Sequence, residues 1–164
     1  ATKGKLVIYD QSDYEQRPVV IEADYRDTSF TNWKLNTKTA DTKYASCRVS
    51  YVEPATGACI EYTAHTEDYD EDAKTNQQLE LYAKVGSVAE AKTMAEKHLR
   101  LHNKFSKTVQ FTHTGHVWYV AGVGIRVKGY GFWDGRYICT QAKHTINENG
   151  YTTTVTGRRI LEGY

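Results

Sequence analysis

The chain has 164 residues, and its 21 Lys or Arg residues are balanced by 20 Asp or Glu residues. This balance gives no sign of a strongly charged partner such as nucleic acid, an acidic polymer or a membrane surface. There is no apolar run of about 20 residues and no signal-peptide pattern, so we expect a protein that neither spans a membrane nor is exported. Because the chain begins at Ala1 without an initiator Met, we expect it to be part of a longer protein.

The composition favours β structure. It includes 13 Tyr and 12 Gly but only 2 Pro, and Tyr, Thr and Val suit pleated, half-buried strands. The three cysteines, Cys47, Cys59 and Cys139, form neither a disulfide framework nor a metal-binding pattern, so we expect reduced thiols. A chain of this length can bury a core without such cross-links.

Strands are expected along the first half of the chain. Residues 6–9 and 19–21 are short apolar runs, and residues 30–35 show a weaker strand pattern. The clearest alternation of apolar and polar residues covers 44–52 and resumes at 59–64, with Pro54 and Gly57 between them, which predicts a β-hairpin. The acidic run 67–72 is expected to be a loop, and residues 79–85 another strand.

One amphipathic helix is predicted, from about Val88 to Asn103. Ser87 stands three residues before Glu90, the spacing at which each side chain can bond to the other residue's backbone N–H at a helix start. Apolar residues then recur on one face and charged residues on the other. This pattern is typical of a helix packed on a sheet or a barrel.

Five further strand-like segments follow the helix, at residues 108–113, 117–120, 124–128, 135–144 and 151–159. The run from Asn147 to Gly150 is a hairpin-loop signal, because Asn and Gly tolerate the positive φ of a tight return. We therefore predict a mainly β (α+β) protein. Its main domain is expected to cover residues 41–164, and residues 1–40 to form opening strands or an arm that continues from a preceding part.

Histidines supply the first candidate site. His98 and His102 lie four residues apart on the predicted helix and so share a face. Neither a third ligand nor the glutamate of a zinc peptidase accompanies them, so we expect a structural or surface role. His113 and His116 could join them only if the fold brought strand and helix together.

The acidic run supplies a second candidate. It lacks the central Gly and the closing Glu of a calcium-binding loop. Nothing in the sequence fixes two of its carboxylates across a cleft, as a glycosidase needs. We therefore expect a solvated loop, whose carboxylates include Asp68, Asp70, Glu71 and Asp72.

Glycines and aromatic residues crowd the stretch from 117 to 137. They do not match a phosphate-binding loop, because they lie between strand candidates and not before a helix. Instead they favour tight bends, with aromatic side chains that pack in a core or meet a neighbouring subunit. Together with the basic residues Arg126, Lys128 and Arg136, the same aromatics would alternatively stack on nucleobases or sugars. The predicted turn and interface residues are Trp118, Tyr119, Gly129, Tyr130, Gly131, Phe132, Trp133, Asp134 and Gly135.

Several segments together resemble the phage late control gene D family, which comprises the tail hub, or baseplate hub, proteins of contractile-tailed phages and related particles. They are residues 6–15 (LVIYDQSDYE), 47–51 (CRVSY), 87–102 beginning SVAEAK, 125–139 (IRVKGYGFWDGRYIC), 143–146 (KHTI) and 150–159 (GYTTTVTGRR). The chain departs from the family at residues 116–122 (HVWYVAG), where the family often carries a Pro-containing segment before its Ala-Gly pair.

The resemblance implies a tail-tube-like antiparallel β-barrel with the helix packed against it, as the C-terminal part of a homotrimeric hub. Each subunit of such a hub contributes two similar barrels, and the ring joins the tail tube protein to the central spike and other baseplate proteins. The expected location is a virion or phage-like tail particle made in the bacterial cytoplasm. No enzyme activity, cofactor, metal, membrane partner or specific nucleic acid is implied.

Two other functions remain open. One is a cell-wall hydrolase, because tail hubs sometimes carry lytic domains, although the sequence offers no convergent set of carboxylates or metal ligands. The other is a nucleic-acid or carbohydrate-binding barrel, which would use the aromatic and basic residues between Arg126 and Tyr137.

Overall fold

The computed structural model describes residues 11–37, 43–73 and 75–161. These residues form two compact units. Unit 1 contains residues 11–37 and 107–160, and unit 2 contains the described residues between 43 and 106 together with residue 161. The strand predicted at residues 6–9 lies outside the described residues.

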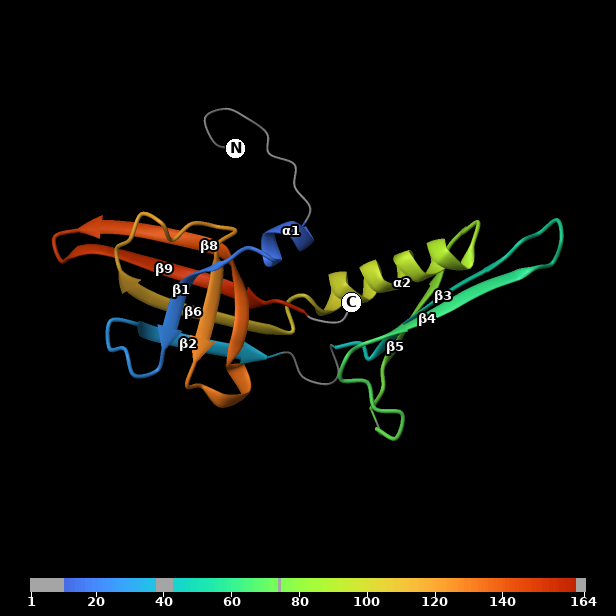
Figure 1. Cartoon of the computed structure of the whole chain (residues 1–164), viewed down its shortest axis with the longest axis horizontal. Coiled ribbons are helices and arrows are strands. Elements are labelled where there is room, and N and C mark those ends of the chain that lie inside the picture. The colour runs from blue at the N-terminus through green and yellow to red at the C-terminus, as the bar shows by residue number, and fades with distance from the viewer. Residues whose placement is uncertain (1–10, 38–42, 74, 162–164) are drawn as a thin grey trace, which may run out of the picture. The chain divides into compact units, whose positions relative to one another are not determined.

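Unit 1 is built on a six-stranded sheet with the strand order β1-β7-β8-β9-β6-β2 (Figure 1). Every neighbouring pair is antiparallel except β1 and β7, which are parallel. A short helix, α1 (Gln11–Glu15), precedes the sheet, and a 3-10 turn, η2 (Gly131–Trp133), lies between β7 and β8. The strands are β1 (Val19–Asp24), β2 (Thr31–Thr37), β6 (Lys107–Thr114), β7 (Gly124–Lys128), β8 (Gly135–Asn147) and β9 (Gly150–Arg159).

One face of this sheet carries the core of unit 1. Because side chains alternate across a strand, every second residue points to the same face. The buried set comprises Ile21, Ala23, Phe30, Val109, Phe111, Tyr119, Ile125, Val127, Tyr137, Cys139 and Val155. The opposite face is rich in Thr, Gln and basic residues. Much of it is solvated, but Ile138 and Arg158 on this face are buried, and Glu15 at the end of α1 pairs with Arg158 there.

The mainly β class with one packed amphipathic helix is confirmed, but the described strands do not close into a barrel. β1 and β2 are the two edges of the sheet and share no ladder in the described chain. The register between β2 and β6 is broken between Thr31 and Lys34, where Asn32 has a φ of 52°. Aromatic contacts connect the two edges instead. The ring centroid of Tyr130 lies 4.4 Å from that of Trp33 in β2 and 5.4 Å from that of Tyr25, which follows β1.

Unit 2 is a two-layer structure of one helix on a three-stranded sheet with the order β4-β3-β5 (Figure 1). β3 (Ser46–Val52) and β4 (Cys59–His65) form the predicted hairpin, and β5 (Gln78–Tyr82) pairs with β3 in parallel. The helix α2 (Val88–Asn103) has the predicted bounds. Its buried residues pack against one face of the sheet, and the resulting core comprises Cys47, Val49, Ala64, Val85, Ala91, Ala95 and Leu99.

The start of α2 shows why the helix begins where it does. The backbone N–H of Glu90 donates to the hydroxyl of Ser87 at 3.2 Å, as the spacing predicts. The Glu90 carboxylate accepts from the backbone N–H of Gly86 at 2.8 Å, one residue before the expected donor. Both bonds satisfy backbone donors that would otherwise have no partner in the helix.

Two sequence expectations differ from the structure. Residues 117–120, predicted as a strand, form turns, with the backbone N–H of Tyr119 donating to the carbonyl of His116 at 3.1 Å. The sequence also separated residues 1–40 from a single domain at 41–164. In the structure, residues from both ends of the chain share unit 1, because β1 pairs with β7 and β2 pairs with β6.

Candidate functional site

The connection between β7 and β8, residues 129–134, is a tight bend held by hydrogen bonds among its own residues. The N–H of Tyr130 donates to the Asp134 carboxylate at 2.6 Å, and the N–H of Asp134 donates to the carbonyl of Gly131 at 2.8 Å. Gly129 has a φ of 85° and Gly135, the first residue of β8, a φ of 142°, a backbone region that disfavours residues with a side chain.

The predicted interface aromatics near this bend have different environments. Tyr137 is fully buried, with its hydroxyl donating to the carbonyl of Trp133 at 2.6 Å, and burial raises its pKa. Tyr130 and Trp133 are half-buried, and burial also raises the pKa of Tyr130. Phe132 remains 60% exposed, with the ammonium of Lys107 lying 3.4 Å from its ring centroid. These rings therefore do not form one open stacking platform.

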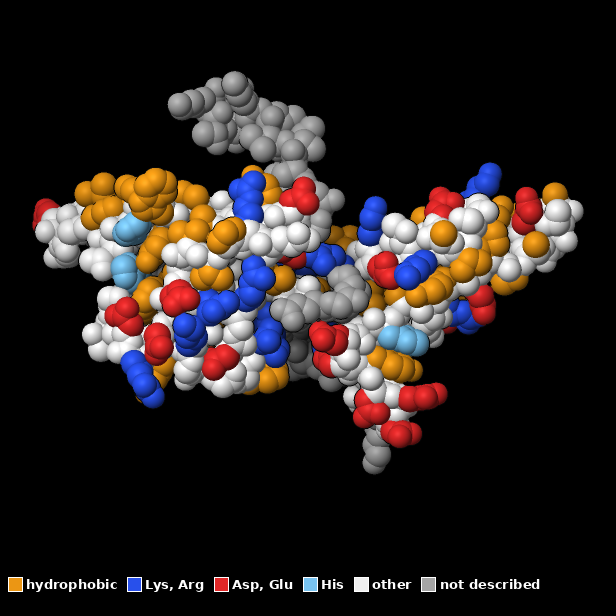
Figure 2. Space-filling model, viewed as in Figure 1, with side chains coloured by type: hydrophobic (Ala, Val, Ile, Leu, Met, Phe, Trp, Pro, Cys, Tyr) orange, Lys and Arg blue, Asp and Glu red, His pale blue; other side chains and the backbone are white. Residues whose placement is uncertain are grey.

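An exposed apolar patch occupies the other end of unit 1. It comprises Val117, Trp118 and Val120 from the connection between β6 and β7, and Ile146 from β8. Trp118 is 68% exposed and Ile146 is 80% exposed. Figure 2 shows hydrophobic side chains gathered over this end of β8 and β9. Such patches are typical of surfaces that meet another protein.

A histidine supports the turn that carries this patch. The Nε2 of His144 lies 3.0 Å from the carbonyl oxygen of Tyr119, which can only accept, so Nε2 carries the hydrogen in the neutral ring. Its Nδ1 then accepts from the Tyr151 hydroxyl at 2.7 Å, and the Thr153 hydroxyl lies 3.0 Å from the same nitrogen. The ring of Tyr119 itself is buried and stacks on His116, with centroids 5.0 Å apart. Tyr119 thus anchors the turn, and Trp118 next to it faces solvent.

The four histidines of the first candidate site divide between the two units. His98 and His102 lie on α2 in unit 2, whereas His113 and His116 belong to unit 1. The ring of His102 meets the edge of Tyr44, at a centroid distance of 5.4 Å. Within the described residues, no three His, Cys, Asp or Glu side chains are arranged to hold a metal ion.

The three cysteines are free thiols, as we expected from their spacing in the sequence. Burial raises the pKa of Cys47 and raises that of Cys139 to about 11, which disfavours the reactive thiolate. Cys59, at the start of β4, is exposed.

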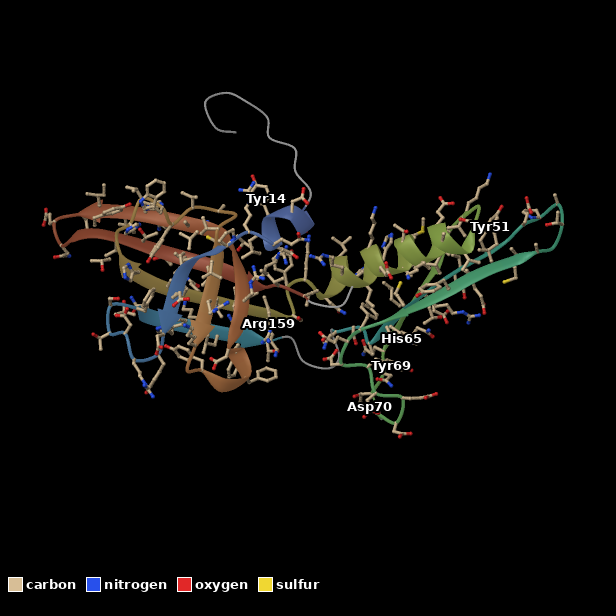
Figure 3. The ribbon with its side chains drawn as sticks, in the orientation of Figure 1. Tyr14, Tyr51, His65, Tyr69, Asp70 and Arg159 are labelled. Atoms are coloured by element: carbon tan, nitrogen blue, oxygen red, sulfur yellow. The ribbon has the colours of Figure 1, made fainter. Side chains whose placement is uncertain are left out.

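The acidic run forms an exposed loop after β4, which we call the acidic loop (residues 67–72). Asp68 pairs with Lys43. Burial acts to raise the pKa of Asp68, but hydrogen bonds from Lys43 and Thr66 and the charge of Lys43 outweigh it, so the pKa lies below its usual value. The rings of His65 and Tyr69 stack, with centroids 4.1 Å apart. Figure 3 shows these two residues near each other and Asp70 beyond them on the loop.

The solvated face of the unit 1 sheet carries two arginines directly opposite each other, Arg126 on β7 and Arg136 on β8. The Nη2 of Arg136 donates to the backbone carbonyls of Glu15 at 3.0 Å and Arg17 at 3.1 Å. Nearby, Lys128 pairs with Glu22 at 3.1 Å. Lys and Arg side chains gather over β7 and β8 in Figure 2.

A buried ion pair between Glu15 and Arg158 was not anticipated from the sequence. It joins α1 to β9 across 143 residues of sequence, and no local pattern links the two positions.

Among the described helices, none has the length and apolar character needed to cross a membrane.

Solved structures with this fold include three tail proteins. The tail protein from Neisseria meningitidis MC58 is 13% identical, with a TM-score of 0.64 over 87% of this chain and 45% of that chain. The prophage MuSo2 43 kDa tail protein from Shewanella oneidensis is 11% identical, with a TM-score of 0.65 over 85% of this chain and 44% of that chain. The prophage tail protein gp18 from Listeria monocytogenes EGD-e is 8% identical, with a TM-score of 0.51 over 88% and 43%.

The likeness to these structures shows a shared fold, and this chain spans less than half the length of each of the three. No curated protein matches the sequence significantly. A family model, described as YQBQ-like, matches residues 1–156, which is nearly the whole chain. The chain therefore belongs to the YQBQ-like family.

Proposed function

We propose that this chain is a structural component of a phage tail or phage-like tail particle. The observation that carries the proposal is the fold: a mixed sheet unit and a helix-on-sheet unit match two tail proteins over at least 85% of the chain with TM-scores of 0.64 and 0.65. Both similarities extend over the two units, so they do not depend on one common motif.

Within the tail, we propose the role of a hub that joins the tail tube to the central spike and the baseplate. The support for this finer role is the resemblance of six segments to the late control gene D family, including 87–102 and 125–139. A homotrimeric ring of the full-length protein is part of this proposal. Because the chain spans less than half of the solved tail proteins, other parts of such a protein would supply further contacts.

The function would depend on surfaces, without a catalytic centre. The patch formed by Val117, Trp118, Val120 and Ile146 offers an apolar contact area. The outer edges of β1 and β2 offer backbone groups that the sheet itself does not pair. Both features suit an assembly whose work is to hold neighbouring proteins.

The two alternative functions gain less support. The carboxylates considered for a hydrolase belong to one exposed loop, whereas a glycosidase needs two carboxyl groups held across a bound sugar. A stacking surface for bases or sugars would need exposed rings, but Tyr137 is fully buried and Tyr130 packs against Trp33. Peptidoglycan turnover by the purified chain, abolished by Asp70→Asn, would favour the hydrolase.

The proposal is tested by asking whether the chain is part of the particle. Tail particles are purified by density gradient from cells that carry a tagged version of the gene, and the tag is detected in each fraction. The tail role predicts that the tag sediments with the particles and survives a salt wash. Tag found only among free proteins would contradict it. Light scattering on the full-length protein tests the ring, which predicts a trimer.

A further inference from the structure

The arginine pair on the solvated face of unit 1 is an unusual arrangement. Arg126 and Arg136 are directly opposite on neighbouring antiparallel strands, a position at which side chains lie about 5 Å apart at Cβ and like charges repel. Ile125, Val127 and Tyr137 point to the core, so the two arginines point to the other face. The backbone of Arg17 lies beside Arg136, because its carbonyl accepts from Nη2 of Arg136 at 3.1 Å.

These three arginines lack a carboxylate partner within the described part of the chain. Arg136 donates to two backbone carbonyls, which carry no net charge, and the Arg17 guanidinium lies 3.8 Å from the ring centroid of Tyr14. Among the basic residues around them, Lys128 is paired with Glu22 and Arg158 with Glu15. The surface formed by Arg17, Arg126 and Arg136, which we call the arginine surface, therefore fits an anion from outside unit 1.

The acidic loop of unit 2 has the complementary property. Asp68 is paired with Lys43, but Glu67, Asp70, Glu71 and Asp72 form no ion pair among the described residues. The loop has a defined backbone, because the Asp72 N–H donates to the Asp70 carboxylate at 3.1 Å and the Ala73 N–H donates to the Asp70 carbonyl at 3.1 Å. Its carboxylates are exposed and gather at one place on unit 2 (Figure 2).

The two units also differ in their total charge. Among the described residues, Lys and Arg outnumber Asp and Glu in unit 1, and the reverse holds in unit 2. The near-zero net charge of the chain therefore conceals a basic unit and an acidic unit. Complementary surfaces of this kind orient two molecules and raise the rate at which they meet.

We infer that the arginine surface binds the acidic loop of a second copy of this chain. The carboxylates of Glu71 and Asp72 can each accept two parallel hydrogen bonds from one guanidinium. A Lys ammonium group does not offer this paired geometry. Since the two surfaces lie on different units, one copy can bind a second and still offer its other surface to a third. Such a head-to-tail contact builds closed rings or open chains, and the inference rests on the ring proposed above.

Two charge-reversal variants of the full chain test the contact. Arg126→Glu changes the arginine surface while leaving Arg136 and its bonds to the carbonyls of Glu15 and Arg17 in place. Glu71→Lys combined with Asp72→Lys changes the acidic loop while keeping Asp70 and its backbone bonds. Lys143→Glu and Glu148→Lys are matched controls, because both side chains are exposed and lie in unit 1 beyond the arginine surface.

Sedimentation velocity reports the self-association of each variant. We expect the unaltered chain to associate at about 0.05 M salt and to associate at least about tenfold more weakly at about 0.5 M salt, where charges are screened within a few ångströms. Each reversal variant should associate about three- to tenfold more weakly at low salt, and the controls should not differ from the unaltered chain. An equimolar mixture of the two reversal variants should recover association between unlike chains, because the unaltered acidic loop of the Arg126→Glu chain can still bind the unaltered arginine surface of the other variant.

Three results would overturn the inference, and they separate it from the ring. Reversal variants that associate like the unaltered chain would remove the arginine surface from the interface but leave a ring possible. A chain that stays monomeric at low salt would remove the contact, and light scattering on the full-length protein would decide the ring separately. If the chain stays monomeric and single-stranded DNA binds it in a manner that requires Arg126, the surface belongs to nucleic acid instead.

Discussion

The carboxylate of Glu15 and the guanidinium of Arg158 form a buried ion pair between the end of α1 and the sheet of unit 1, with an O–N distance of 2.5 Å. The side chains are only 4% and 6% exposed. Glu15 ends α1 and Arg158 lies near the end of β9, so the pair ties the entry of the chain to its last strand. Breaking such a pair leaves a charge in a place that water does not reach.

Replacing Glu15 by Gln is expected to destabilise the protein by about 3–5 kcal/mol, because Arg158 would remain buried without a counter-charge. Urea unfolding followed by circular dichroism measures the change. Asp13→Asn is the control, since Asp13 is an exposed residue of the same helix and should change stability by less than about 0.5 kcal/mol. Equal stability of the two variants would show that the pair does not hold α1.

Gly135→Val is expected to impair folding. Gly135 has a φ of 142°, and an added Cβ would lie 3.1 Å from Nη2 of Arg159. A β-branched residue in this conformation costs about 1–3 kcal/mol from the backbone alone. Gly86→Ala serves as the control, because its Cβ would meet only the Glu90 carboxylate at an ordinary 3.5 Å. A melting temperature for Gly135→Val equal to that of the unaltered protein would refute this expectation.

Trp133→Ala is expected to lower the free energy of unfolding by about 1–3 kcal/mol, because the ring is half-buried and packs at 5.2 Å against Phe132. Its backbone carbonyl, which accepts from the Tyr137 hydroxyl, would remain. Phe132→Ala, at a more exposed ring, should cost less. Denaturant titration of both variants checks the order, and a larger loss for Phe132→Ala would contradict it.

Trp118→Ala is expected to leave stability within about 0.5 kcal/mol while reducing incorporation into tail particles, because the side chain is 68% exposed. The neighbouring Tyr119, which is buried, gives the contrasting control: Tyr119→Ala should lower stability. Thermal melts and the gradient fractionation described above supply the two readings. Normal incorporation of Trp118→Ala would exclude the apolar patch from the assembly contact.

The free energy of unfolding is expected to fall at alkaline pH because the buried thiol of Cys139 resists ionisation. Burial raises the pKa of this thiol from 9.0 to about 11 in the folded protein. Between these values the unfolded chain loses the thiol proton while the folded chain keeps it, so the stabilising effect is complete below about pH 9 and is lost as pH rises toward 11. Unfolding curves for Cys139→Ala and the unaltered protein should therefore converge with rising pH. Parallel curves across this range would contradict the assignment.

Local features of the fold could be predicted from the sequence because local physics produces them. Ser87 and Glu90 mark the start of α2, and the alternation on both sides of Pro54 and Gly57 marks the hairpin of β3 and β4. The failure at residues 117–120 has a clear cause. That run is apolar like a strand, but Trp118 faces solvent and only Tyr119 is buried.

Long-range features could not be predicted in the same way. The parallel pairing of β1 with β7 joins Ile21 to Ile125, and no turn signal links segments so far apart. The contact between Glu15 and Arg158 has the same character. The ring of Trp33 in β2 also contacts the ring of Tyr130, which follows β7. Neither composition nor periodicity predicts which aromatic residues meet in this way.

Electron microscopy of purified particles tests the central claim most directly. A gold-binding tag is placed in the exposed turn at Glu148 and Asn149, between β8 and β9. A tail hub predicts label at the junction of the tail tube and the baseplate, in about the same position on every particle. Particles that carry no label, from cells that make the tagged chain in quantity, would contradict a role in the tail.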